Sequence, residues 1–174
     1  MPVGGWNGKL QVVGNGGFAG TIGYRALATA LAAGYAVAST DTGHSGPAAN
    51  TFANEDATLD FAYRAIHETA VAAKRAVDHY YGAPPRLSYF TGCSTGGQQG
   101  HMSAQRYPAD YDGILIGDAA NNRTHDHTAA LWATSGRTGR RWRYISAPTR
   151  LARWRQRAPS NAPSRAAALP VIRS

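Results

Sequence analysis

The stretch Gly92-Cys93-Ser94-Thr95-Gly96 decides the fold of this chain. It matches G-x-S-x-G, the pattern of a nucleophilic serine on a sharp turn between a strand and a helix. Chance alone easily produces such a match in a chain with 20 glycines, so the flanking sequence is decisive. Residues 87–91 have the composition of a buried strand, and residues 94–107 that of a helix. The motif therefore lies where a nucleophile elbow requires it.

The alternation of strands and helices continues on both sides of the motif. Short apolar runs bounded by glycine or proline predict strands at 10–13, 35–39, 87–91 and 113–117. Helical spacing of apolar residues predicts helices at 24–33, 58–81 and 94–107. Strands that alternate with helices form parallel sheets with helices on both faces. We therefore predict an α/β fold with a mostly parallel sheet.

The net charge of +8 is unevenly distributed along the chain. Residues 137–174 hold ten arginines and no acidic residue, whereas residues 1–136 hold eight basic and ten acidic residues. Beyond residue 136, Arg, Ala, Pro and Ser dominate and no strand or helix period is visible. We therefore predict a folded region at 1–136 and a disordered, basic, low-complexity tail at 137–174.

Two explanations of this tail stay open. Basic clusters with interleaved aromatic residues, such as Arg140-Arg141-Trp142-Arg143-Tyr144, are typical of proteins that bind nucleic acid or an anionic membrane surface. Out-of-frame reading of a GC-rich gene gives a similar composition, and the abrupt loss of acidic residues favours this frameshift hypothesis. No specific nucleic-acid site is therefore predicted.

Membrane and export signals are not recognisable in the sequence. No apolar run approaches the roughly 20 residues that a transmembrane segment needs, and the first residues lack a signal-peptide pattern. Cys93 is the only cysteine, which excludes an intrachain disulfide. The residues alone leave the compartment unknown.

Acyl transfer at a serine needs N–H donors for the oxyanion that forms at the carbonyl. The N–H of Thr95 lies at the positive end of the predicted helix, directly after Ser94. A second donor comes from the loop after an earlier strand, a position held here by Gly14-Asn15-Gly16-Gly17. We predict Ser94 as the nucleophile, with Thr95 and Gly17 as oxyanion donors and Gly16 as the next choice. An ordinary tight turn explains these glycines equally well.

Six strings of the sequence together resemble the tannase and feruloyl esterase family, in the family's order. They are Trp6-Asn7-Gly8, Gly14-Asn15-Gly16-Gly17-Phe18-Ala19-Gly20, Ser39-Thr40-Asp41-Thr42-Gly43-His44, Gly92-Cys93-Ser94-Thr95-Gly96-Gly97, Gln105-Arg106-Tyr107-Pro108 and Asn121-Asn122-Arg123-Thr124-His125. The resemblance covers about residues 2–134 and implies a partial α/β-hydrolase fold, with 1–136 as the N-terminal part of a catalytic domain. It also implies a secreted or periplasmic serine esterase that acts on hydroxybenzoate or hydroxycinnamate esters.

The sequence departs from the family pattern after this region. Family members carry a lid domain with bound calcium, then the triad Asp and His, and they join the Cys before the nucleophile to a Cys beside the catalytic His. None of these features is recognisable here. We therefore predict a truncated or frameshifted member with impaired activity, without a calcium site or another cofactor. In this interpretation Cys93 is a buried free thiol.

The residues after Ser94 offer few candidates for a triad acid and base. The acid candidates are Asp110, Asp112, Asp118 and Asp126, and the base candidates are His101, His125 and His127. His101 follows Ser94 by seven residues, which separates the two by about 10 Å along a helix axis. Asp118 follows a predicted strand, but the resemblance gives it no catalytic role. We therefore do not predict a rebuilt triad.

The other histidines have simpler explanations than catalysis. His44 is predicted to bond to the backbone and to shape its turn together with Asp41. His67 is predicted to pack on the helix that carries it. His125 and His127 are too few ligands to predict a metal site.

Two functions from different classes follow. The first is a serine carboxylic ester hydrolase whose partner is a small aromatic ester. The second is a catalytically inactive fragment that binds nucleic acid or an anionic surface non-specifically through its Arg-rich tail. In addition, the strand 113–117 is expected to be an unprotected sheet edge, which predicts self-association.

Overall fold

The computed structural model describes residues 1–46 and 48–135. Within this part, residues 1–121 form one compact unit, and the helix α5 (Arg123–Ser135) belongs to a separate unit. α5 has no counterpart among the predicted elements. The basic tail at 137–174 lies outside the described residues, so its disorder and its binding properties stay predictions.

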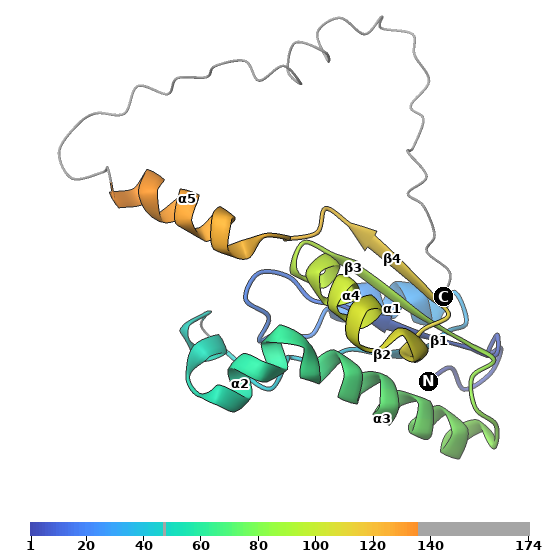
Figure 1. The fold of residues 1–174 in the computed structure, drawn as a ribbon. Helices are drawn as coiled ribbons and strands as arrows, with labels where there is room; N and C mark the ends of the chain where they lie inside the picture. Colours follow the sequence, from blue (N-terminus) through green and yellow to red (C-terminus); the bar gives the residue numbers. More distant parts are fainter. Residues whose placement is uncertain (47, 136–174) are drawn as a thin grey trace, which may run out of the picture. The chain divides into compact units, whose positions relative to one another are not determined.

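Four parallel strands form the sheet of the unit 1–121, in the order β2-β1-β3-β4 (Figure 1). They are β1 (Lys9–Val13), β2 (Ala36–Ala38), β3 (Leu87–Cys93) and β4 (Gly113–Gly117). β1 pairs in parallel with β2 and β3, and β3 pairs in parallel with β4. Each strand matches a predicted one, so the predicted parallel sheet is confirmed.

The α-helices of this unit are α1 (Tyr24–Ala32), α2 (Glu55–Leu59), α3 (Ala65–Tyr81) and α4 (Thr95–Arg106). A π-helical segment at Asp60–Arg64 joins α2 to α3, and short 3₁₀ turns lie at Ala48–Phe52 and Pro108–Asp110. Within the described residues, none of the helices combines the length and the hydrophobicity that a membrane crossing requires.

The long helical stretch differs from its prediction at one end. It begins at Glu55 rather than at residue 58, because the side chain of Asn54 accepts a hydrogen bond from the N–H of Ala57 at 2.9 Å. Such a cap satisfies an N–H group that the helix itself leaves unpaired. The other end agrees with the prediction, since Gly82 stops α3 in the left-handed conformation at φ 71°.

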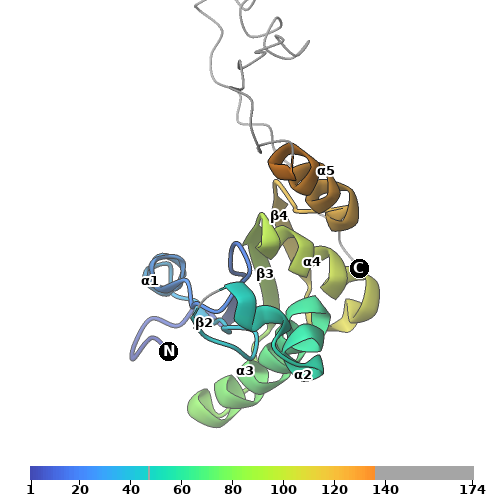
Figure 2. The same ribbon diagram turned by 90° about the vertical axis from the view of Figure 1, so that its left-hand side faces the viewer.

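The helices cover the two faces of the sheet unequally. α3 packs on β1 and β2, and α4 packs on β3 and β4, both on one face (Figure 2). α1 lies on the opposite face, against β2 and β1. Helices therefore lie on both faces, as predicted, but within the described residues the α1 face is open over β3 and β4. Leu115, in the middle of β4, is 50% exposed there.

The hydrophobic core lies between the sheet and α3. Its members are Leu10, Val12, Ala36, Ile66, Ala70, Ala73, Val77, Phe90 and Tyr111. Burying one large apolar side chain of this kind contributes about 1.5–3 kcal/mol. The core fixes the α3 side of β1 and β3, and so determines where both strands end.

One core residue carries a polar group that finds no partner. Tyr111 is 4% exposed, and its hydroxyl makes no hydrogen bond within the described residues. Burial, together with the charge of Asp110, raises the pKa of this hydroxyl. We expect Tyr111→Phe to raise the free energy of unfolding by about 1 kcal/mol, because an unpaired buried hydroxyl costs about 1–3 kcal/mol.

Thermal unfolding measures this effect. Tyr24→Phe is the control, since Tyr24 is 74% exposed and its hydroxyl is solvated. A lower melting temperature for Tyr111→Phe than for the unmodified chain contradicts the prediction.

β4 is an edge strand within the described residues, because it pairs only with β3. Unpaired strand edges next to exposed apolar side chains favour association between copies. We expect concentration-dependent self-association, measured by sedimentation equilibrium, and we expect Leu115→Lys to weaken it. Leu31→Lys, at an exposed position of α1, is the matched control. A monomer at all concentrations contradicts the prediction.

Candidate active site

Ser94 lies at the turn between β3 and α4, as the motif predicts. Its backbone has φ 59° and ψ −116°, a conformation that non-glycine residues rarely adopt and that costs about 1–3 kcal/mol. Besides the helical bond from the N–H of Gln98 to the carbonyl oxygen of Ser94, two backbone hydrogen bonds connect Ser94 to the segment at the end of β4. The N–H of Ser94 donates to the carbonyl oxygen of Gly117 at 3.1 Å, and the N–H of Ala120 donates to the carbonyl oxygen of Ser94 at 2.9 Å. The end of β4 therefore helps to fix the elbow.

Glycines around Ser94 allow the backbones to approach closely. A Cβ at Gly92 would lie 2.3 Å from the carbonyl oxygen of Gly96, and a Cβ at Gly97 would lie 2.6 Å from the Cα of Ala119. Both separations are too short for real atoms. Gly92 and Gly97 therefore make room for the turn and for the segment after β4.

The Ser94 side chain is accessible, and α4 begins with the next residue. Within residues 1–46 and 48–121 its hydroxyl makes no hydrogen bond. The first turn of α4 contains no acidic residue, so no carboxylate offsets the positive end of the helix dipole beside Ser94. The surroundings therefore favour negative charge next to the serine.

The glycine-rich loop after β1 comes into contact with the elbow. The N–H of Gly14 donates to the carbonyl oxygen of Thr91 at 2.9 Å, which extends the pairing of β1 and β3 by one bond. Gly17 then accepts a hydrogen bond at its carbonyl oxygen from the hydroxyl of Thr95. The structure thus brings together the two residues that were predicted as oxyanion donors, Thr95 and Gly17.

A buried polar pair makes a second connection between α4 and this loop, and the sequence interpretation missed it. Gln99 is 2% exposed and Asn15 is 7% exposed. The N–H of Asn15 donates to Oε1 of Gln99 at 3.2 Å, and Nε2 of Gln99 donates to Oδ1 of Asn15. One sequence signal was available. Thr95, Gln99 and Ser103 follow each other at helical spacing on the glycine-rich face of α4.

His44 has the structural role that was predicted for it. It is 9% exposed, and its Nε2 lies 2.9 Å from the carbonyl oxygen of Phe18. Its Nδ1 lies 3.3 Å from the carbonyl oxygen of Thr42. Asp41 shapes the same turn by accepting from the N–H of Gly43 at 3.0 Å. The loop after β2 therefore supports the glycine-rich loop through Phe18.

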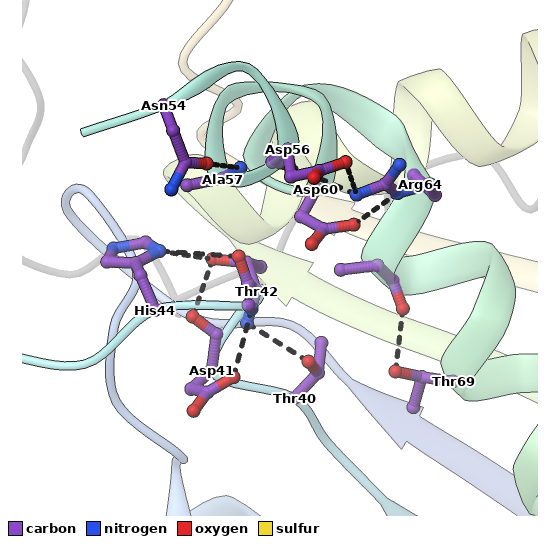
Figure 3. A network of polar contacts seen from close by, with 12 residues as sticks. Thr40, Asp41, Thr42, His44, Asn54, Asp56, Ala57, Asp60, Arg64 and Thr69 are labelled. Atoms are coloured by element: carbon purple, nitrogen blue, oxygen red, sulfur yellow. Dashed lines mark hydrogen bonds and ion pairs between the residues drawn. The ribbon is translucent and has the colours of Figure 1, made fainter. Parts of the chain in front are cut away.

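Two carboxylates that follow the loop after β2, those of Asp56 and Asp60, are paired with the guanidinium of Arg64 (Figure 3). Asp60 accepts from Nε of Arg64 at 2.6 Å, and Asp56 lies 2.9 Å from the guanidinium of Arg64. The hydrogen bond to Asp60 is the main cause that raises the pKa of Arg64, and the hydrogen bond to Asp56 is the second. These groups stabilise the start of the long helical stretch and are not placed to exchange protons with Ser94.

None of the candidate triad residues of the unit 1–121 forms a hydrogen bond to Ser94 within the described residues. Asp110 instead pairs with Nδ1 of His67 at 2.8 Å, and His67 stacks on Tyr107, so His67 is the packing histidine that was predicted. Asp112 accepts from the N–H of Ser88 at 2.7 Å.

The remaining candidates lie elsewhere. Asp118 follows β4 at φ 39°, and His101 lies in the second half of α4. The other three candidates lie on α5, in the separate unit, and are His125, Asp126 and His127.

The prediction that Cys93 is buried is wrong. Cys93 is exposed, because odd-numbered residues of β3 point to the sheet face that is open over β3 and β4. Its side chain lines a hollow of about 530 Å³ on that face, together with Thr91 of β3, Leu115 of β4 and Ala26 of α1.

The described residues contain no group of three or more His, Cys, Asp or Glu side chains close enough to hold a metal ion. The expectation that the chain has no calcium site and no other cofactor stays a prediction.

Comparisons with known proteins agree with this geometry. The family model described as "Tannase and feruloyl esterase" matches residues 1–160, beyond residue 134 where the resemblance was expected to end. A probable feruloyl esterase B-2 from Aspergillus flavus is 45% identical over 116 residues, which are 66% of this chain and 22% of that protein.

Solved structures show the same similarity. The crystal structure of feruloyl esterase B from Aspergillus oryzae has a TM-score of 0.64 at 38% identity, over 67% of this chain and 24% of that one. The crystal structure of an esterase from Aspergillus oryzae has a TM-score of 0.69 at 33% identity, over 78% of this chain and 28% of that one. The chain thus spans about a quarter of the length of the relatives that it matches.

The contact between Gly92 and Gly96 generates a prediction about stability. Gly92→Ala would force two backbone segments apart, and we expect it to lower the free energy of unfolding by about 1–3 kcal/mol, the usual range for overpacking. Gly16→Ala is the matched control, since a Cβ at Gly16 meets nothing within 4 Å. Urea unfolding of the two variants tests this. Equal midpoints contradict the proposed close approach.

Proposed function

The chain belongs to the tannase and feruloyl esterase family, and from this we propose that it carries the nucleophile and the oxyanion hole of a serine carboxylic ester hydrolase. Ser94 is the nucleophile, and the N–H groups of Thr95 and Gly17 stabilise the oxyanion. The observation that supports this proposal best is the backbone of Ser94. Ser94 is exposed at φ 59° on a sharp strand-to-helix turn, and backbone strain of this kind in a non-glycine residue is concentrated at functional sites.

The reaction follows from these three residues. Ser94 Oγ attacks the ester carbonyl carbon, and the carbonyl oxygen becomes negatively charged between the two N–H donors. The C–O bond to the alcohol then breaks, the alcohol leaves with a proton, and an acyl-serine ester remains. Water hydrolyses this ester, releases the carboxylic acid and restores the Ser94 hydroxyl.

The proposed substrates are aromatic esters, of hydroxybenzoic or hydroxycinnamic acids. Family membership supports this class, since a relative and a solved neighbour carry the name feruloyl esterase. The same membership favours a secreted or periplasmic location. Which acid and which alcohol are preferred depends on parts of the relatives that this chain does not match.

Impaired activity is part of the proposal. Within residues 1–46 and 48–121 the Ser94 hydroxyl has no hydrogen-bond partner, so no residue of this unit is placed to accept its proton. General base catalysis typically contributes about 10²–10⁴-fold to such a reaction. We therefore expect Ser94 to react more slowly than a serine with a histidine partner, but faster than an ordinary surface serine.

Covalent labelling tests the proposal. A fluorophosphonate reacts when Ser94 Oγ forms a bond to phosphorus, fluoride leaves with the electrons of the P–F bond, and the serine proton passes to solvent. We expect intact-mass and peptide analysis to find the adduct on Ser94 of the full chain and no adduct above background in Ser94→Ala. Ser45→Ala, at an exposed loop serine, should label like the unmodified chain. Equal labelling of the unmodified chain and Ser94→Ala contradicts the proposal.

A further inference from the structure

The glycine-rich loop has little to hold it in place by itself. Gly16 and Gly17 are exposed, and Gly17 has φ 60°. A turn forms over Gly16 to Ala19, closed by the bond from the N–H of Ala19 to the carbonyl oxygen of Gly16 at 3.0 Å. Such turns differ in the direction of their central peptide, which here joins Gly17 to Phe18, and glycine adopts several of these conformations at low cost.

Side chains from α4 fix both the direction of that peptide and the position of the loop. The hydroxyl of Thr95 donates to the carbonyl oxygen of Gly17, which is the carbonyl of the central peptide. Thr95 is 1% exposed, so water does not compete for this bond. Flipping the peptide would break this buried hydrogen bond between Thr95 and Gly17.

The Asn15–Gln99 pair fixes the start of the same loop. Besides its two bonds with Gln99, Asn15 donates from Nδ2 to the carbonyl oxygen of Thr40 at 2.9 Å. Three segments therefore meet at one buried amide group: α4, the end of β1 and the loop after β2. Buried networks in which every group is satisfied are rigid, because breaking one bond leaves polar atoms without water.

The loop has other attachments, but they lead away from the elbow. The carbonyl oxygen of Phe18 accepts from Nε2 of His44 at 2.9 Å and from the hydroxyl of Thr51 at 2.9 Å. These bonds tie the loop to the segment after β2. Side-chain hydrogen bonds from Thr95 and Gln99 connect the loop to α4, the helix that begins directly after the nucleophile.

We propose that the side chains of Thr95 and Gln99, the latter through Asn15, are positioning groups that hold Gly17 at the nucleophile elbow, and with it the N–H of the peptide that joins Gly16 to Gly17. This inference rests on the proposed function, in which that N–H is an oxyanion donor. Thr95 then has two separate tasks. Its backbone N–H contacts the oxyanion, and its hydroxyl sets the place of the second donor.

The first arm of the test measures the reaction of the full chain with a fluorophosphonate in two parts, probe affinity and the rate constant of bond formation. Thr95→Val keeps the shape of the side chain and removes the hydroxyl, whereas Thr95→Ser keeps the hydroxyl. We expect Thr95→Val to slow bond formation by about tenfold or more, since losing one oxyanion donor costs about 10²–10³-fold. Probe affinity should stay unchanged, and Thr95→Ser should restore the rate.

A second pair of variants keeps the inference testable if Thr95→Val fails to fold. Gln99→Leu removes the bonds to Asn15, and Gln105→Leu, on the exposed side of the same helix, is its matched control. We expect only Gln99→Leu to slow bond formation. If Thr95→Val and Gln99→Leu react as fast as the unmodified chain, the inference is overturned.

The second arm does not depend on reactivity. The N–H of Ala19 is protected from exchange by its hydrogen bond to the carbonyl oxygen of Gly16, a bond that involves neither Thr95 nor Gln99. We expect its hydrogen exchange to accelerate about tenfold or more in Thr95→Val and Gln99→Leu relative to their controls, while amides of β1 and β3 keep their protection.

The two arms separate the two claims. If the unmodified chain does not label at Ser94, the proposed function fails, and exchange at Ala19 alone decides whether these side chains position the loop. Unchanged exchange at Ala19 overturns the positioning inference even when Ser94 labels normally.

Discussion

The close approach of β3 and α4 at Ser94 is the constraint on which the rest of the site depends. A Cβ at Gly92 would lie 2.3 Å from the carbonyl oxygen of Gly96, so only glycine at that position allows the chain to turn sharply. The turn forces Ser94 to a positive φ, and bonds from Gly117 and Ala120 offset part of that strain. This arrangement has a chemical consequence. The serine is exposed at the N-terminus of a helix, where negative charge is stabilised.

Two kinds of interaction have different roles in building the site. Apolar packing of α3 on β1 and β2 forms the core on one face of the sheet, and the parallel pairing of β1 with β3 brings the ends of these two strands together. Polar contacts from α4 then position the loop after β1, because Thr95 and Gln99 form hydrogen bonds to this loop that are buried from water. Distances in the site are thus set by directional bonds, whereas the position of the site in the fold is set by the core.

The elements of the sheet could be predicted from the sequence because their signals are local. Apolar runs, helical spacing and stop residues such as Gly82 lie within the segments that they specify. The contact of Thr95 with Gly17 joins residues 78 positions apart and has no local signal. The exposure of Cys93 was mispredicted for a related reason. Burial of β3 on its second face depends on which elements cover it, and the described residues include only α1 there.

Solution NMR of the full chain tests the central claim most directly, namely that the glycine-rich loop is held against the elbow by α4. The account predicts nuclear Overhauser contacts between the Thr95 side chain and the α protons of Gly17, together with a Ser94 coupling constant typical of positive φ. Contacts between Val12 and Phe90, paired in the core of the sheet, serve as the internal reference. If those reference contacts are present while Thr95 and Gly17 show none, the sheet folds without assembling the site, and the account is contradicted.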